Sequence, residues 1–364
     1  MIKKVCLLLV LLGYIVQSQE NKKYYSFDVN NFYGTILKHN PDISHLITGH
    51  PSGILLSVNR KTFGNKEWQK LYNSPDYGVS FIYQDMDNEF LGENYGLYAH
   101  YNFYFFKRIL MLRIGQGLAY GTNPYDEDDN FRNVAYGSHL MSSTFAMLNL
   151  KKENIIGGLG LQTGIGVIHY SNANFKAPNK STNTFVFNLG LNYALDTEYP
   201  EYIKKEKGAV RGSEPIGYGF IFRGGINESD VVGSGQYPFY TIAAFADKRI
   251  NKKSAVQLGA ELFFSEALER FIDFRSTGDF RDGTTGDEDS KRVGIFLGHE
   301  LRINKISILT QLGYYIYYPY DFEGQMYNRF GARYYFNKKI FGSITVRSHA
   351  AKAEAVEFSI GYRL

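Results

Sequence analysis

Cysteine is nearly absent from this sequence, whose 364 residues include only Cys6. That residue lies in an apolar N-terminal segment, so a chain without this segment has no thiol and no disulfide framework. Tryptophan, with one residue, and proline, with nine, are also scarce. The formal net charge is only +4, which is too small to suggest a nucleic-acid partner.

Long hydrophobic runs are lacking after the first residues. The chain begins with Lys3 and Lys4, continues with an apolar run over 5–16, and reaches Ser18 at a plausible cleavage position. This order is typical of a secretory signal peptide, which we predict to be residues 1–18. No later stretch has about 18 consecutive apolar residues, so the mature chain offers no spanning helix.

Aromatic residues and glycine are abundant instead, with 30 Tyr, 28 Phe and 37 Gly. Aromatic side chains favour strands over helices. An exported chain that is rich in aromatic residues and lacks spanning helices can still cross a membrane if its strands close into a barrel.

Apolar and polar residues alternate in many segments. In the last ten residues, Val356, Phe358 and Ile360 lie on one face of the predicted strand, whereas Glu357 and Ser359 lie on the other. The segments TFVFNLGLNYAL and KISILTQLGYYIYY alternate in the same way. A soluble β-sandwich also alternates, so the connections between strands must separate the two folds.

The connections alternate in length and charge. Short basic turns are predicted at 105–110, 149–155, 246–254, 302–306 and 336–340, and longer acidic or glycine-rich connections separate them. Short turns opposite long loops are typical of an outer-membrane barrel, although the connections 65–77 and 196–215 break the rule. We therefore predict an all-β fold, a transmembrane antiparallel β-barrel of about 14 to 16 strands over 19–364, in the outer membrane of a Gram-negative bacterium.

One predicted strand ends in an unexpected way. In GLGLQTGIGVIHYS, the apolar side chains share one face, and the period of two places His169 and Ser171 on that same outward face. Polar groups facing lipid are costly except near the interface, so ordinary interface residues are one explanation.

Catalysis is the other explanation, because a third polar residue joins this pair. The next predicted strand, TNTFVFNLGLNYAL, places Asn183 outward, and antiparallel pairing brings it beside His169. A serine, a histidine and an orienting amide form the arrangement of a nucleophilic hydrolase. Ser171 would be the nucleophile, His169 the base and Asn183 the residue that orients the imidazole.

The motif HYSNANFKAPN, with a polar residue four positions after its last Asn, resembles the outer-membrane lipid A deacylases, the PagL-type or acyloxyacyl hydrolase-like family. The close match covers about residues 155–195. The resemblance implies an ester hydrolase acting on lipid A, with the amides of Asn172 and Asn179 near the oxyanion together with main-chain N–H groups.

The sequence departs from this family in two ways. The well-known members have eight strands and are much shorter, and their third catalytic residue is Glu, where this chain has Asn183. Outer-membrane phospholipase A also has a His-x-Ser pair and uses an Asn, which keeps phospholipid open as the substrate. A non-enzymatic channel or structural barrel is the third alternative.

The sequence indicates no cofactor and no metal site. The acidic runs at 126–129 and 287–289 lack the spaced oxygen ligands of a calcium site, so calcium is not indicated. The expected partners are lipid A or phospholipid and the outer membrane, without nucleic acid, and the oligomeric state is left open.

Overall fold

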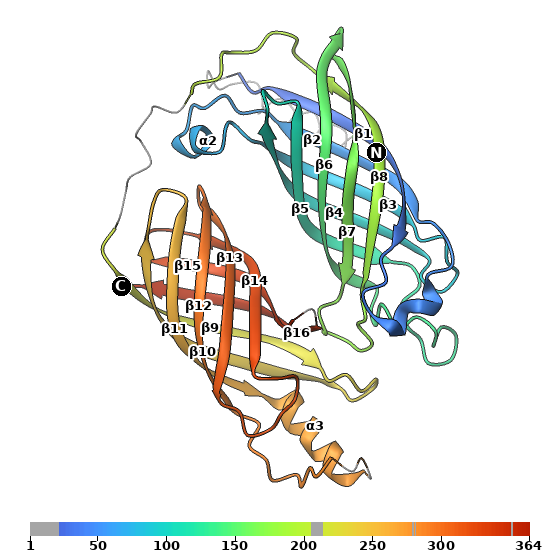
Figure 1. Ribbon diagram of the computed structural model, residues 1–364, viewed down its shortest axis with the longest axis vertical. Helices are drawn as coiled ribbons and strands as arrows, with labels where there is room; N and C mark the ends of the chain where they lie inside the picture. Colours follow the sequence, from blue (N-terminus) through green and yellow to red (C-terminus); the bar gives the residue numbers. More distant parts are fainter. Residues whose placement is uncertain (1–21, 205–213, 279, 281, 351) are drawn as a thin grey trace, which may run out of the picture.

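The computed structural model describes residues 22–204, 214–278, 280, 282–350 and 352–364, so the predicted signal peptide lies outside the described residues. Within them, 16 strands form two closed antiparallel barrels of eight strands each (Figure 1). β1 pairs with β8 to close the first barrel, and β9 pairs with β16 to close the second.

The first barrel contains β1 (Tyr25–Ile36), β2 (Ser52–Arg60), β3 (Asp76–Asp85), β4 (Glu93–Phe105), β5 (Leu110–Gly121), β6 (Leu140–Ile156), β7 (Leu159–Ser171) and β8 (Thr182–Ala194). The second contains β9 (Gly217–Glu228), β10 (Gln236–Arg249), β11 (Ser254–Ser265), β12 (Arg292–Ile303), β13 (Ile306–Tyr317), β14 (Met326–Tyr335), β15 (Ile340–His349) and β16 (Lys352–Arg363). Their connections include the helices η1 (Pro41–Leu46), α2 (Glu67–Leu71) and α3 (Glu266–Thr277).

The prediction of an all-β fold is confirmed, and the 16 strands match the upper end of the predicted range of 14 to 16. The prediction that these strands form one barrel over 19–364 is wrong. Alternation specifies which face a side chain occupies and not which strand is the partner, so it cannot show where a sheet closes. The two connections that break the loop rule have other roles. The connection 65–77 holds α2, and 196–215 lies between the two barrels.

The side chains alternate between the lumen and the outer face as predicted. In β16, Phe358 is 60% exposed on the outer face, whereas Glu357 is fully buried in the lumen. In β8, Phe187 and Leu189 are exposed and Asn188 between them is buried. The outer faces of both barrels are therefore apolar, and the polar residues fill the interior.

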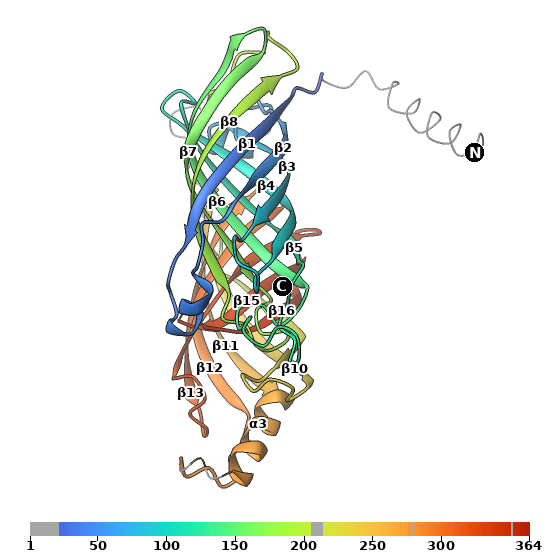
Figure 2. The ribbon, with the colours of Figure 1, turned by 90° about the vertical axis from the view of Figure 1, so that its right-hand side faces the viewer.

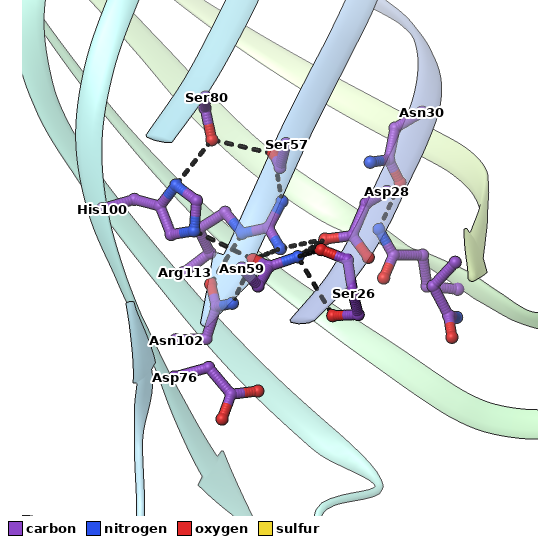
Figure 3. Close-up of polar contacts among 12 residues, drawn as sticks. Ser26, Asp28, Asn30, Ser57, Asn59, Asp76, Ser80, His100, Asn102 and Arg113 are labelled. Atoms are coloured by element: carbon purple, nitrogen blue, oxygen red, sulfur yellow. Dashed lines mark hydrogen bonds and ion pairs between the residues drawn. The ribbon is translucent and has the colours of Figure 1, made fainter. Parts of the chain in front are cut away.

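A hydrogen-bond network fills the lumen of the first barrel (Figure 3). Arg113 pairs with Asp28 and donates to Asn102 at 2.7 Å and to Ser57 at 2.8 Å. The Asn59 amide donates to Asp28 at 2.9 Å. Because each buried charge has a partner of opposite sign or a hydrogen bond, the cost of removing it from water is offset.

The second lumen is filled by arginine–glutamate pairs. Arg329 Nη1 lies 3.0 Å from Glu261, and Arg329 Nε lies 2.5 Å from Glu357. Arg292 contacts Glu354 at 2.6 Å. Eight-stranded barrels have an interior that side chains can fill, and both do so here. This packing argues against the channel considered from the sequence.

The short turns lie close to their predicted places, with one exception. The segment 149–155 was predicted as a turn, but it lies within β6, and the turn follows at Gly157 and Gly158, which both have positive φ. Lys151, which suggested an exposed basic turn, is buried in the lumen and lies 3.4 Å from Asp28. Charge composition therefore placed this turn too early.

One contact between the two barrels lies at the end that carries the short turns. Tyr72, just after α2, donates a hydrogen bond from its hydroxyl to the carbonyl oxygen of Arg302 at 2.7 Å. Burial raises the pKa of Tyr72 to about 12, so this donor keeps its proton at neutral pH. The longer connections of both barrels, including η1 and α3, lie toward the opposite end (Figure 2). In the described part of the chain, no helix is long and apolar enough to cross a membrane.

Candidate active site

Neighbouring strands place His169 and Asn183 side by side. His169 in β7 is directly opposite Asn183 in β8, and both side chains are half-buried on the outer face of the barrel. The Nδ1 atom of His169 lies 2.8 Å from the Oδ1 atom of Asn183. The pairing expected from strand parity is therefore present.

This contact determines the tautomer of the imidazole. An amide oxygen can only accept a hydrogen bond, so Nδ1 of His169 carries the proton and Nε2 keeps its lone pair. This tautomer makes Nε2 the basic nitrogen of the ring.

Ser171 ends β7 and lies beneath its own loop, with 5% of its surface exposed. Its hydroxyl donates to Asn179 Oδ1 at 3.0 Å and accepts from the Ala173 N–H at 2.9 Å. No hydrogen bond joins it to His169 in the described residues.

The loop between β7 and β8 contains the amides that the family resemblance places near the oxyanion. The N–H of Asn172 donates to Asn179 Oδ1 at 3.0 Å, which identifies that atom as oxygen and leaves the Asn179 Nδ2 as a donor without a partner among the described residues. The Asn172 Nδ2 instead donates to the Lys176 carbonyl at 2.6 Å. The side-chain amide of Asn172 is thus engaged within the loop, where it holds the chain near Lys176.

A row of polar side chains continues from the His169–Asn183 pair along the outer face. Thr144 is opposite His169, and Gln116 is opposite Thr144, so four consecutive strands each supply a polar residue at one level. Gln116 also donates to Ser142 at 3.0 Å and accepts from Thr144. This row was not predicted from the sequence, although the outward parity of Gln116 in an apolar strand indicates it.

In the described part of the chain, no group of three or more His, Cys, Asp or Glu side chains could hold a metal ion. In the acidic loop at 126–129, the carboxylate of Asp126 accepts from the N–H groups of Asp128 and Asp129, each at 3.0 Å. These main-chain hydrogen bonds lower the pKa of Asp126, which keeps its charge within the loop.

Two long segments of the chain match known families. A family model described as lipid A 3-O-deacylase (PagL) matches residues 52–192, and one described as acyloxyacyl hydrolase, C-terminal domain, matches residues 216–364. No curated protein matches. Two engineered variants of the Rh. blastica porin are 9% identical and cover 94% of this chain and 100% of their own, with a TM-score of 0.19 that carries no argument.

The two family models together span most of the chain, and each falls on one barrel. The eight strands of the first barrel also remove one departure noted from the sequence, because the additional strands form a separate barrel. The chain therefore belongs to the lipid A 3-O-deacylase (PagL) family, a family of carboxylic ester hydrolases, and carries the acyloxyacyl hydrolase C-terminal domain as its second barrel.

Proposed function

We propose that this protein is an outer-membrane esterase that removes an ester-linked acyl chain from lipid A. The observation that carries the proposal is the 2.8 Å contact between His169 Nδ1 and Asn183 Oδ1 on the outer face. His169 lies two residues before Ser171 in β7. An imidazole oriented by an amide next to a serine serves nucleophilic ester cleavage. The family membership supports lipid A as the substrate.

In the proposed reaction, Nε2 of His169 accepts the proton of the Ser171 hydroxyl while the serine oxygen attacks the ester carbonyl. The carbon–oxygen bond to the lipid headgroup breaks, and the imidazolium returns its proton to the leaving oxygen. Water, activated by the same imidazole, then hydrolyses the acyl-enzyme and releases a fatty acid. Asn179 and the Ala173 N–H stabilise the oxyanion in both steps.

The outer position of these residues supports a substrate that remains in the membrane. The wall around them consists of apolar side chains such as Leu118, Phe185 and Phe187, all exposed. An acyl chain lying against this wall would reach Ser171 without leaving the hydrocarbon layer.

The test is to incubate the detergent-solubilised protein with purified lipid A and, separately, with phospholipid, and to weigh the products by mass spectrometry. We expect loss of one acyl chain from lipid A and a slower or absent reaction with phospholipid. Faster release from phospholipid would instead support a phospholipase with the same residues. Release from neither would end both proposals and leave a structural barrel.

Removal of the orienting amide is expected to reduce turnover without abolishing it. In Asn183→Ala the imidazole loses one neutral hydrogen bond, worth about 1 kcal/mol, so kcat should fall about five- to tenfold. In Asn183→Asp a carboxylate replaces the amide and stabilises the imidazolium more strongly, so activity should be retained. An Asn183→Ala protein as fast as the parent would exclude the orienting role.

The polar row provides a test of substrate choice. Gln116, Ser142 and Thr144 place amide and hydroxyl groups on the outer wall. An unsubstituted acyl chain could form no hydrogen bond with these groups, so covering them with such a chain would be costly. We propose that this row favours acyl chains that carry a hydroxyl group. In Gln116→Leu/Thr144→Val, kcat/KM for a hydroxyacyl ester should fall about tenfold relative to the unsubstituted acyl ester, a difference of about 1.4 kcal/mol. An unchanged ratio would show that the row has no part in specificity.

A further inference from the structure

The second barrel holds the loop that carries the candidate catalytic residues. Glu228, at the end of β9, donates from its N–H to the carbonyl oxygen of Asn174 at 3.1 Å and accepts from the Asn174 side-chain amide at 3.3 Å. Asn174 lies in the loop between β7 and β8 of the first barrel. In Figure 1 this loop lies against the ends of the second barrel's strands.

The carboxylate of Glu228 makes a second contact with the same loop. One oxygen accepts from the Ala177 N–H at 2.8 Å, and the other accepts from the Gly235 N–H at 3.2 Å. Glu228 is 3% exposed, and in the described residues no cationic side chain forms an ion pair with it. A buried carboxylate is costly unless it is hydrogen-bonded, so these main-chain donors account for its presence.

Gln236, the first residue of β10, adds another contact. Its side-chain amide donates to the carbonyl oxygen of Phe175 at 2.7 Å. Within the loop segment 174–177, Asn174, Phe175 and Ala177 are therefore hydrogen-bonded to the second barrel. The loop is fixed from outside as well as by its own hydrogen bonds.

Short paths lead from these contacts to Ser171. The Asn174 N–H donates to the side chain of Asn172 at 3.1 Å, and the Asn172 N–H donates to Asn179 Oδ1, which accepts from Ser171. Ala177, bonded to Glu228, is two residues before Asn179. A shift of the loop would thus move both the partner of the Ser171 hydroxyl and the proposed oxyanion donors.

We propose that Glu228 is a positioning residue for the catalytic loop, and that the second barrel exists in this chain to hold that loop in its reactive arrangement. The inference rests on the proposed function for its catalytic meaning, but the contact itself is independent of it. Small displacements of catalytic groups cost large factors in rate. Glu228 therefore acts on turnover more than on substrate binding, because the acyl-binding wall belongs to the first barrel alone.

The contact is tested by a chemical cross-link that locks the loop to the second barrel in the full chain. The only native cysteine is Cys6, so Phe175→Cys with Gln236→Cys introduces a single new pair in the described residues. Because the hydrogen bond joins the end of the Gln236 side chain to the Phe175 carbonyl oxygen, the pair is linked with a flexible, cleavable bis-maleimide, which spans more than a disulfide does. We expect a cross-linked peptide, detected by mass spectrometry after proteolysis, and none from the matched control, Phe175→Cys with Phe222→Cys on the outer wall of β9. Absence of the cross-linked peptide from the first pair would overturn the docked arrangement, whatever the enzyme activity is.

The role in catalysis is tested by substitution of Glu228. Glu228→Ala should lower kcat about ten- to hundredfold with KM within about twofold, because the loop loses its external anchor. Glu228→Gln keeps one acceptor oxygen and should fall between the alanine variant and the parent. Asp230→Asn, which removes a charge from the same rim without touching the loop, should keep the parent kcat.

These results separate the inference from the proposed function. If the parent releases fatty acid and Glu228→Ala has the parent kcat, or if the cross-linked protein is inactive and recovers on cleavage of the linker, the positioning role is wrong and the esterase remains. If the parent releases no fatty acid from any lipid, the proposed function fails together with the catalytic role of Glu228, while the lock still decides the contact. Heat-modifiable migration of each variant verifies that the barrels are folded.

Discussion

Replacing Ser171 with alanine is expected to abolish deacylation, with a loss of kcat of at least about 10³-fold. The hydroxyl is the proposed nucleophile, and no other group takes that part in the proposed reaction. The measurement is fatty acid release from lipid A by parent and variant, followed by mass spectrometry. The substitution removes one atom at the end of a strand, so heat-modifiable migration should be unchanged.

Ser181→Ala is the matched control for this prediction, because Ser181 lies in the same loop and its hydroxyl contacts His39 instead of Asn179. It should retain the parent rate. If Ser171→Ala hydrolyses lipid A as fast as the parent does, the assignment of the nucleophile is wrong, and the polar residues of the outer wall have another purpose.

His169→Gln is expected to lower kcat by about 10³-fold as well, since general-base assistance is lost and serine is a weak nucleophile without it. Glutamine can still hydrogen-bond to Asn183, so the variant removes the base and keeps the cross-strand contact. The comparison with Asn183→Ala is informative, because that substitution removes the hydrogen bond and keeps the imidazole, whereas His169→Gln removes the imidazole and keeps a hydrogen bond.

The order of the two rates is the critical outcome. A much slower His169 variant indicates that the imidazole does chemistry and that Asn183 only orients it. Equal rates in both variants would indicate that the pair is a structural contact between β7 and β8.

Strand positions and the faces of their side chains could be predicted from the sequence. The period of two correctly placed Glu357 in the lumen and Phe358 outside, and it brought Asn183 opposite His169. This succeeded because the face of a side chain is a local property that follows from the pleat. The catalytic roles of these residues remain predictions.

Closure into two barrels could not be predicted in this way. The pairings of β1 with β8 and of β9 with β16 join segments that are far apart in the chain. The alternation within each strand is the same in one large barrel and in a small one, so the pattern does not show which strand is the partner. The connection 196–215 stood out because it broke the loop rule, but its composition did not show that it lies between two closed sheets.

The details of the site depend on contacts that have no sequence signal. The Ser171–Asn179 hydrogen bond follows from the fold of the loop, and Glu228 meets Asn174 across 54 positions of the chain. A glutamate at the end of an alternating strand reads as an ordinary rim residue. Only the packing of one barrel against the other makes it a candidate for positioning.

The covalent connection between the barrels has a consequence for the strength of their association. Because β8 ends at Ala194 and β9 begins at Gly217, the two rims are tethered at an effective concentration of the order of millimolar. A small number of contacts, such as those of Glu228 and Gln236, can then stay formed at any dilution of the protein. If the chain were cut between the barrels, the same contacts would depend on protein concentration and would be lost on dilution.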